Sequence, residues 1–138
     1  MPSVEVNMTM QKKGAMFRRP KHTVQDVTNK FVQFVAEKGE EELSTMLRPQ
    51  PSGVYKVNST TTGHYRRNIN TAFSSGKAII NDGKVVYGRW LEGVSSRNQT
   101  TRFKGYFSFR KTAHLLQKFV KQQAKPFARR YVQRLNRP

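Results

Sequence analysis

Aromatic and basic side chains are interleaved in one short stretch, TRFKGYFSFRK, which spans residues 101–111. Cations can hold phosphates and aromatic rings can stack on bases, so this composition is typical of an RNA-binding surface. The RNA-recognition strand pattern is K/R-G-F/Y-G/A-F-V-x-F/Y, and residues 104–106 fit its start. The match then fails, because Phe107 and Ser108 stand where the pattern needs Gly or Ala and then Phe.

A second pattern in the same stretch is a simple alternation. Aromatic residues or Gly occupy every second position from Phe103 to Phe109, and the positions between them are basic or polar. This period of two predicts a strand with an aromatic face turned inward, where Phe103, Phe107 and Phe109 belong to the core. The cations expected on the outward face are Arg102, Lys104 and Arg110.

The titratable residues show no pattern of catalytic chemistry. His22, His64 and His114 are far apart, and the sequence has no HExxH, no Gly-rich phosphate loop ending in Lys-Ser/Thr and no GxSxG. Residues 40–42 are three adjacent Glu, which on a helix point to different sides and form a solvated acidic patch rather than an acid/base pair. We therefore expect no enzyme activity and no catalytic residue.

Metal, cofactor and membrane sites are not indicated either. The chain has no Cys, which excludes disulfides and thiolate metal sites, and the spacing of Asp26, Asp82 and Glu92 predicts no shared metal ion. No apolar run approaches the roughly 18 to 20 residues of a membrane helix, and the start MPSVEVNMTMQKK lacks the apolar core of a secretory signal. We expect no metal, no cofactor, no membrane contact and a soluble protein made inside the cell.

Charge is the dominant compositional feature. The formal net charge is +18, and the chain has no acidic residue after Glu92, whereas residues 97–137 contain twelve Lys or Arg. Such a field attracts polyanions, of which nucleic acid is the usual one. The same charge can instead keep a protein soluble or face acidic neighbours in an assembly, and the composition leaves both interpretations open.

The first half of the chain contains one predicted helix. Residues 1–21 are polar or basic without periodicity, which indicates an extended basic arm that orders only against a partner. Apolar residues then recur at steps of three and four from Val24 to Leu47, and Thr23 is a candidate N-cap. We expect one helix over residues 22–47, although Gly39 inside it costs about 1 kcal/mol relative to Ala.

The middle of the chain predicts strands. Pro49 and Pro51 end the helix, and residues 48–62 form a long polar loop. Residues 66–73 and 77–82 are predicted strands, and the turn signal at residues 81–83 precedes a third, over residues 84–88. A short helical segment is expected next, within YGRWLEG, and it ends at Gly93.

The last thirty residues predict a long basic amphipathic helix. Apolar residues keep one face from Leu115 to Leu135 while Lys and Arg occupy the other, and the helix is expected to kink or restart at Pro126. A membrane surface or calmodulin can bind such a helix, but a small sheet covered by its apolar face is simpler. The predicted fold is α+β: a single domain over residues 22–138, with a small antiparallel sheet packed against both long helices.

Three local features, in this order, resemble one family. The first is Thr-Gly followed by an aromatic residue, basic residues and Ile, in residues 62–69. The second is Tyr-Gly-Arg-Trp-Leu-Glu-Gly, in residues 87–93, and the third is the closing basic helix after an aromatic-rich stretch. Together with the long first helix and the Pro-containing loop, they resemble the neck or tail-completion proteins of tailed bacteriophages, the family named for the tenth gene product of a lambdoid HK phage. The family usually has Leu where Tyr65 stands and Ser where Asn68 stands.

The resemblance implies a structural virion protein without catalysis, made in the host cytoplasm. It implies a homo-oligomeric ring at the head–tail junction, in contact with connector or head-closure proteins and with tail-tube or tail-terminator proteins. Such a ring surrounds the DNA channel, so non-specific contact with genomic DNA is implied as well. The candidate contacts with DNA or with an acidic partner are Arg97, Arg102, Lys104, Arg110 and Lys111.

The candidate interface residues are Arg66, Arg67, Tyr87, Trp90 and Glu92. On the predicted strand Arg66 and Arg67 point to opposite faces, so at most one reaches a given partner. Tyr87 and Trp90 are expected in the core. Glu92 is expected to pair with a cation, either within the subunit or across an interface. A second hypothesis, from another class, is a small basic nucleic-acid-binding protein, such as a ribosome-associated or packaging factor.

Overall fold

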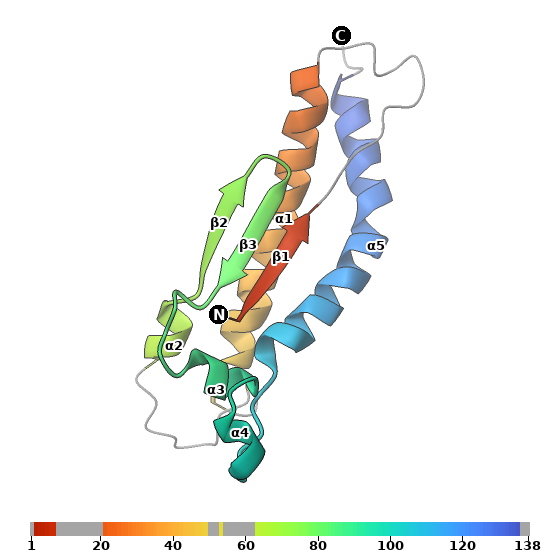
Figure 1. Cartoon of the computed structure of the whole chain (residues 1–138). Helices are drawn as coiled ribbons and strands as arrows, with labels where there is room; N and C mark the ends of the chain where they lie inside the picture. The colour runs from red at the N-terminus through yellow and green to blue at the C-terminus, as the bar shows by residue number, and fades with distance from the viewer. Residues whose placement is uncertain (1, 8–20, 50–52, 54–62, 136–138) are drawn as a thin grey trace.

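The computed structural model describes residues 2–7, 21–49, 53 and 63–135. Three strands form one antiparallel sheet in the order β1-β3-β2. Two long helices pack against this sheet, and three short helices lie in the connections (Figure 1). The predicted α+β class is confirmed. The elements in chain order are β1 Ser3–Asn7, α1 Lys21–Met46, α2 His64–Arg67, β2 Asn70–Ser74, β3 Lys77–Asn81, α3 Gly88–Glu92, α4 Arg97–Thr100 and α5 Ser108–Leu135.

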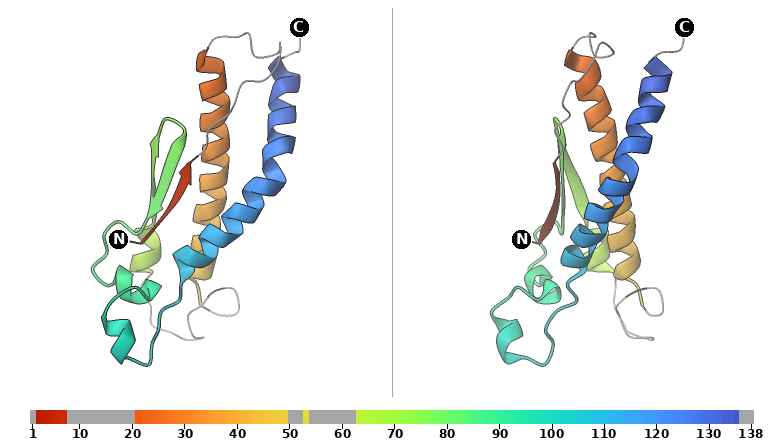
Figure 2. Two further views of the ribbon diagram at one scale, coloured as in Figure 1. Left: turned by 45° about the vertical axis from the view of Figure 1, so that its right-hand side comes forward. Right: turned by 90° about the vertical axis from the view of Figure 1, so that its right-hand side faces the viewer.

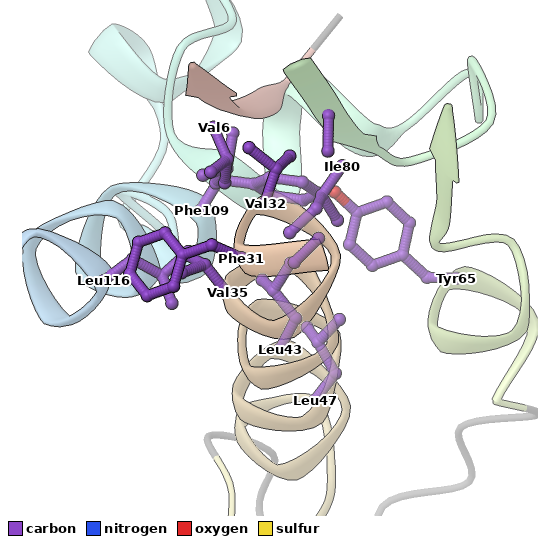
Figure 3. Close-up of a cluster of buried hydrophobic side chains, with 13 residues drawn as sticks. Val6, Phe31, Val32, Val35, Leu43, Leu47, Tyr65, Ile80, Phe109 and Leu116 are labelled. Atoms are coloured by element: carbon purple, nitrogen blue, oxygen red, sulfur yellow. The ribbon is translucent and has the colours of Figure 1, made fainter. Parts of the chain in front are cut away.

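The core lies where the sheet, α1 and α5 meet (Figures 2 and 3). Strand β1 alternates exposed and buried residues, and β3 has the same period, so each strand turns one row of side chains toward the helices. Val4 and Val6 of β1 and Ile80 of β3 are buried in this way. On α1 the apolar stripe is buried as its spacing predicted, with Phe31, Val35 and Leu43 among its fully covered residues.

Aromatic rings join the two long helices. Phe34 of α1 lies 5.3 Å from Phe119 and 5.7 Å from Phe127, measured between ring centroids, and Phe31 lies 5.0 Å from Phe127. Such ring pairs stabilise a contact beyond the area they bury. Helix α5 is continuous across Pro126, so the predicted restart there does not occur.

Gly39, which weakens α1 as an isolated helix, is explained by this packing. It is buried, and a Cβ at this position would lie 2.6 Å from Cδ1 of Ile80 and 2.9 Å from Cδ1 of Leu116. The missing side chain therefore lets α1 approach both β3 and α5.

Several local predictions are wrong in type. Ser3–Asn7 is not part of an arm that needs a partner but an edge strand paired with β3. Arg66 and Arg67 lie on helix α2 instead of a strand, because the strand begins only at Asn70. The hairpin turn falls at Ser75 and Gly76, between β2 and β3, and residues 84–88 form turns and the start of α3 rather than a strand.

The stretch 101–107 is also not a strand. It is an irregular connection that ends where α5 begins at Ser108, so Phe109 is buried as expected but from a helix. Its residues alternate in type, but none of the strands in the described sheet pairs with it. Most of the predicted loop over residues 48–62 lies outside the described residues, and so do residues 8–20 of the predicted arm.

Candidate interaction site

Residues 85–107, which connect β3 to α5 and contain α3 and α4, project from one end of the molecule as a small lobe (Figure 1). We call it the connecting lobe. Its interior is aromatic: the ring centroids of Trp90 and Phe103 lie 4.5 Å apart, and those of Phe103 and Tyr106 lie 4.8 Å apart. Two aromatic residues of the stretch 101–111 thus build the lobe instead of facing a ligand.

A buried amide holds the lobe together. The side-chain N–H groups of Asn98 donate to the carbonyl oxygens of Trp90 at 3.0 Å and Phe103 at 3.3 Å. Its side-chain oxygen accepts the backbone N–H of Ser95 at 3.0 Å. Since buried polar groups are costly when unpaired, these bonds fix the path of the chain on both sides of α4. The sequence analysis did not identify Asn98, because a single Asn in a polar stretch carries no pattern.

Two glycines bring the backbones of the lobe together. Gly93 ends α3 with φ of 94°, and Gly105 has φ of 108°. A Cβ on Gly105 would collide with Gly93, and one on Gly93 would collide with the carbonyl oxygen of Lys104. Gly63, before α2, also has a positive φ, of 75°, a conformation that favours glycine.

Glu92 joins the connecting lobe to α5. Its side chain is buried, and its oxygens accept the backbone N–H of Phe109 at 2.9 Å and that of Arg110 at 3.2 Å. Burial raises the pKa of this carboxyl above its usual value, and the two backbone hydrogen bonds oppose that rise. The expected pairing with a cation is corrected: the carboxyl oxygens accept from backbone groups at the N-terminus of a helix, although Arg110 and Lys111 lie near enough to lower the pKa.

The outer surface of the connecting lobe exposes apolar side chains around an open groove. Val86 is 98% exposed, Val94 45% and Tyr87 42%. The groove has a volume of about 640 Å³ and is lined by the residues Val86, Tyr87, Arg89, Trp90, Ser95, Ser96, Arg97 and Thr101. Apolar side chains flanked by two guanidinium groups are a suitable surface for a protein partner.

The candidate interface residues divide between this groove and other places. Tyr87 is exposed rather than in the core, and half-buried Trp90 lines the groove with it. Arg66 is half-buried and Arg67 exposed on α2, which borders the lobe through the ring contact of Tyr65 with Tyr87 at 6.0 Å. Glu92 lies inside the protein, so it supports the site without facing a partner.

The predicted cationic contacts are exposed but do not form one surface. Arg97 lines the groove, and Arg102 lies on the connecting lobe. The ammonium group of Lys104 donates to the carbonyl oxygens of Asn98 at 2.9 Å and Gln99 at 3.2 Å, so it already caps α4. The other two, Arg110 and Lys111, begin α5, and the Arg110 guanidinium lies 4.7 Å from the centre of the Phe107 ring.

The three adjacent Glu of α1 are only partly a solvated patch. Glu42 pairs with Lys38 at 2.9 Å, and Glu40 accepts a hydrogen bond from the Thr71 hydroxyl on β2. Only Glu41 is exposed. The patch therefore helps to fix the sheet on α1 as well as offering charge to solvent.

The sequence predicted no separate role for Asp82, yet its carboxyl is the most buried one in the described part of the chain. It follows β3 and is 1% exposed, with one oxygen accepting the backbone N–H of Lys84 at 3.1 Å. Burial raises the pKa of Asp82, and its bond to Lys84 and the nearby Tyr65 hydroxyl lower it by less. Gly88 leaves room for the second carboxyl oxygen, since a Cβ there would collide with it.

No family model, curated protein or solved structure matches the chain. Among the residues that the structure describes, no three His, Asp or Glu side chains gather as a metal ion would need, and no helix has the length and apolar character to cross a membrane.

Proposed function

We propose that this chain is a structural subunit of the head–tail junction of a tailed bacteriophage, which assembles as a ring between connector and tail. The observation that carries the proposal is the exposed apolar groove of the connecting lobe. Val86 is 98% exposed and Tyr87, which also lines the groove, is 42% exposed in the described subunit, and a neighbouring subunit or a tail protein would bury both. The ring would place the protein in the virion, at the neck or tail.

The position of the family-like motifs supports the same proposal. Residues 63–69 form α2 and its caps, and residues 87–93 form α3 with its two ends. The two motifs contact each other through Tyr65 and Tyr87, and the second reaches the start of α5 through Glu92. The three features that resemble the neck family thus meet around one lobe, where a neck protein would use them to present an interface.

A groove on one side of a subunit suits a ring. Head-to-tail contacts join two different surfaces and generate closed rings when the rotation closes. The groove is lined by the cations Arg89 and Arg97, and the exposed Glu41 of α1, which does not line the groove, is a complementary charge on the same chain. Connector and tail proteins would occupy the ends of such a ring.

The test compares two variants of the full-length chain. Val86→Asp puts a charge into the groove, and Ala72→Asp puts the same charge on the exposed edge strand β2. Mass photometry and electron microscopy would follow ring formation alone and with the connector and tail proteins encoded beside it. We expect Val86→Asp to reduce assembly by at least ~10-fold, the loss expected for a buried charge at an interface, and Ala72→Asp to assemble normally.

Two results would overturn the proposal. One is a wild-type chain that forms no ring and never associates with phage particles, while it shifts RNA at nanomolar concentration in physiological salt. The other is equal assembly of both variants, which would exclude the groove as the interface. Genes for portal, capsid and tail-tube proteins are expected beside the gene of this chain, and particles that lack it are expected to be heads without attached tails.

The alternative function is a small basic nucleic-acid-binding protein, ribosome-associated or involved in packaging. The net charge of +18 favours it. Such a protein would bind DNA or RNA tightly as an isolated monomer, with affinity that falls steeply as salt rises. The two functions are therefore separated by the oligomeric state of the active form and by its presence in particles.

A further inference from the structure

Helix α5 presents a row of cations that the apolar packing of the molecule leaves free. Its exposed Lys111, Lys118, Lys121, Lys125 and Arg129 follow one another at steps of three, four or seven residues. With 3.6 residues per turn, these side chains leave the helix within about 80° of one another. We call these five residues the α5 row. With a rise of 1.5 Å per residue, it extends over about 27 Å.

We propose that the α5 row binds the phosphate backbone of duplex DNA without reading its sequence. A row of about 27 Å spans about eight phosphates of one strand, which are spaced by 3.4 Å along the axis. The proposal does not depend on a place in a phage neck, so its failure and the failure of the proposed function are separate results.

The row is rigid because its opposite face is packed. Phe119 and Phe127 lie against Phe34 and Phe31 of α1, and Leu116 is buried in the core. A cation held on a fixed helix loses less freedom on binding than one on a loose arm. Figure 1 shows α5 along one side of the molecule, away from the strands β2 and β3.

No ion pair found in the described part of the chain neutralises the row. The chain has no Asp or Glu after Glu92, and the buried Glu92, near Lys111 at the start of α5, accepts hydrogen bonds from backbone N–H groups. The ion pairs found in the described part of the chain join Lys38 to Glu42 and Lys77 to Glu5, and neither involves α5. The charge of the row is therefore not neutralised within the described subunit.

The chemistry of the exposed face favours phosphate over a protein surface. Between the cations this face carries His114, Gln117 and Gln122, and no exposed large apolar side chain. Protein interfaces are centred on apolar and aromatic groups and are depleted in Lys, which describes the connecting lobe better than the α5 row. This face also has no exposed Phe, Tyr or Trp among its described residues, which disfavours single strands, since these are held by stacking on aromatic groups.

A membrane surface is disfavoured by the packing. An amphipathic helix binds a bilayer by inserting its apolar face. In α5 that face is engaged by α1 and by β1, since Val120 and Phe127 pack against the core cluster. Binding to a bilayer through this face would require α5 to leave the fold.

The experiment measures binding of the full-length chain to a labelled 20-bp duplex of arbitrary sequence by fluorescence anisotropy. The salt concentration is varied from about 50 to 200 mM, because affinity that depends on phosphate contacts falls steeply over this range. The row variant carries Lys118→Gln, Lys121→Gln and Lys125→Gln. The matched control carries Arg48→Gln, Arg67→Gln and Lys84→Gln, three exposed cations outside α5 that are not candidate DNA contacts. Both change the formal net charge from +18 to +15, since 18 − 3 = 15.

We expect the row variant to bind at least ~10-fold more weakly at low salt and the slope of log affinity against log salt to fall by about 2.7, which is three contacts at 0.9 each. The control is expected to lose less than ~3-fold, as the net charge alone requires. A second variant with Lys118→Arg, Lys121→Arg and Lys125→Arg keeps the charge of the wild type, so it is expected to keep the wild-type slope. Circular dichroism checks that all variants are folded.

Four outcomes would overturn the proposal. Equal losses in both variants would show that binding follows the net charge and not the row. No duplex binding by the wild type at 50 mM salt would exclude a phosphate site, and binding of the single strand more tightly than the duplex would indicate stacking instead. Binding to phosphatidylserine-containing vesicles that depends on the row, without duplex binding, would assign the row to a membrane surface.

Discussion

The Glu92 carboxylate accepts the backbone N–H of Phe109 at 2.9 Å, across 17 residues of chain. Helix N-termini leave N–H groups without partners, and a carboxylate satisfies them and also matches the positive end of the helix dipole. Here the acceptor comes from the end of α3, so the contact joins the connecting lobe to α5. The start of α5 therefore depends on a residue outside the helix.

Replacement of Glu92 by Ala is expected to destabilise the protein by about 1–2 kcal/mol, the cost of losing an N-terminal cap whose N–H groups are buried. Glu92→Gln retains one acceptor oxygen and is expected to lose less. Urea denaturation followed by circular dichroism measures the free energy of unfolding. Glu41→Ala, at an exposed position of α1, is the control and is expected to change it by less than about 0.5 kcal/mol. An equal loss in both variants would contradict the capping role.

This contact also explains what the sequence could not predict. The two long helices were found because their apolar residues recur over many turns, and residues 77–82 were predicted as a strand that ends at the turn signal of residues 81–83. The stretch 101–107 alternates, but a strand needs a partner strand and none lies beside it in the described sheet. Where α5 begins is set instead by Glu92, and local patterns do not contain such a distant contact.

Tyr87, Trp90 and Arg97 were candidate site residues, but the sequence did not predict that they meet in one groove, for the same reason. The groove is formed by Tyr87 and Trp90 at one end of the lobe and by Arg97 and Thr101 at the other, and their proximity follows from the turns at Gly93 and Gly105. Tyr87 was expected in the core because its helical spacing matches Trp90 and Leu91. Spacing gives the face of a helix but not whether another element covers that face.

The burial of the Asp82 carboxyl is expected to make the free energy of unfolding depend on pH. Burial raises the pKa of Asp82 in the folded protein above its ordinary value of 3.8, so the folded protein binds this proton more tightly than the unfolded chain does. The contribution of Asp82 to stability is then greatest below pH 3.8 and is lost as the pH rises through the folded-state pKa.

Asp82→Asn removes this cost at neutral pH and is expected to stabilise the protein by about 1 kcal/mol at pH 7, the scale of one poorly paired buried group. The gain is expected to vanish near pH ~2.5, well below 3.8, where the carboxyl is neutral in both states. Unfolding free energies at the two pH values measure it. Asp26→Asn, exposed on α1, is the control, and a pH-independent gain at Asp82 would contradict the explanation.

Close backbone packing makes Gly93 intolerant of a side chain. Gly93→Ala combines a positive φ, which costs about 1–2 kcal/mol, with a collision against the Lys104 carbonyl, which adds about 1–3 kcal/mol. Gly63→Ala shares the positive φ, but the nearest atom to its Cβ, an Arg67 nitrogen, lies 3.8 Å away. We expect Gly63→Ala to cost about 1–2 kcal/mol and Gly93→Ala to cost clearly more. Thermal or urea unfolding compares them, and equal losses would contradict the collision.

Gly39 gives the most direct test of how α1 packs. In an exposed helix Gly→Ala stabilises by about 1 kcal/mol, but here the new Cβ would meet Cδ1 of Ile80 at 2.6 Å. Because Ile80 is fully buried, overpacking is expected to outweigh the gain in helix propensity, with a net loss of about 1 kcal/mol. Ile80→Val removes the Cδ1 atom, so Gly39→Ala is expected to cost less in that background than in the wild type.

The double-mutant cycle of these two substitutions measures the coupling, which is expected to be about 1 kcal/mol because the two residues are in direct contact. Leu116 provides a second contact, at 2.9 Å, so the rescue by Ile80→Val is expected to be partial. Ile79→Val, on the opposite face of β3, is the matched control, because its side chain points away from α1. Additive free energies with Ile80→Val would show that α1 and β3 do not approach through Gly39.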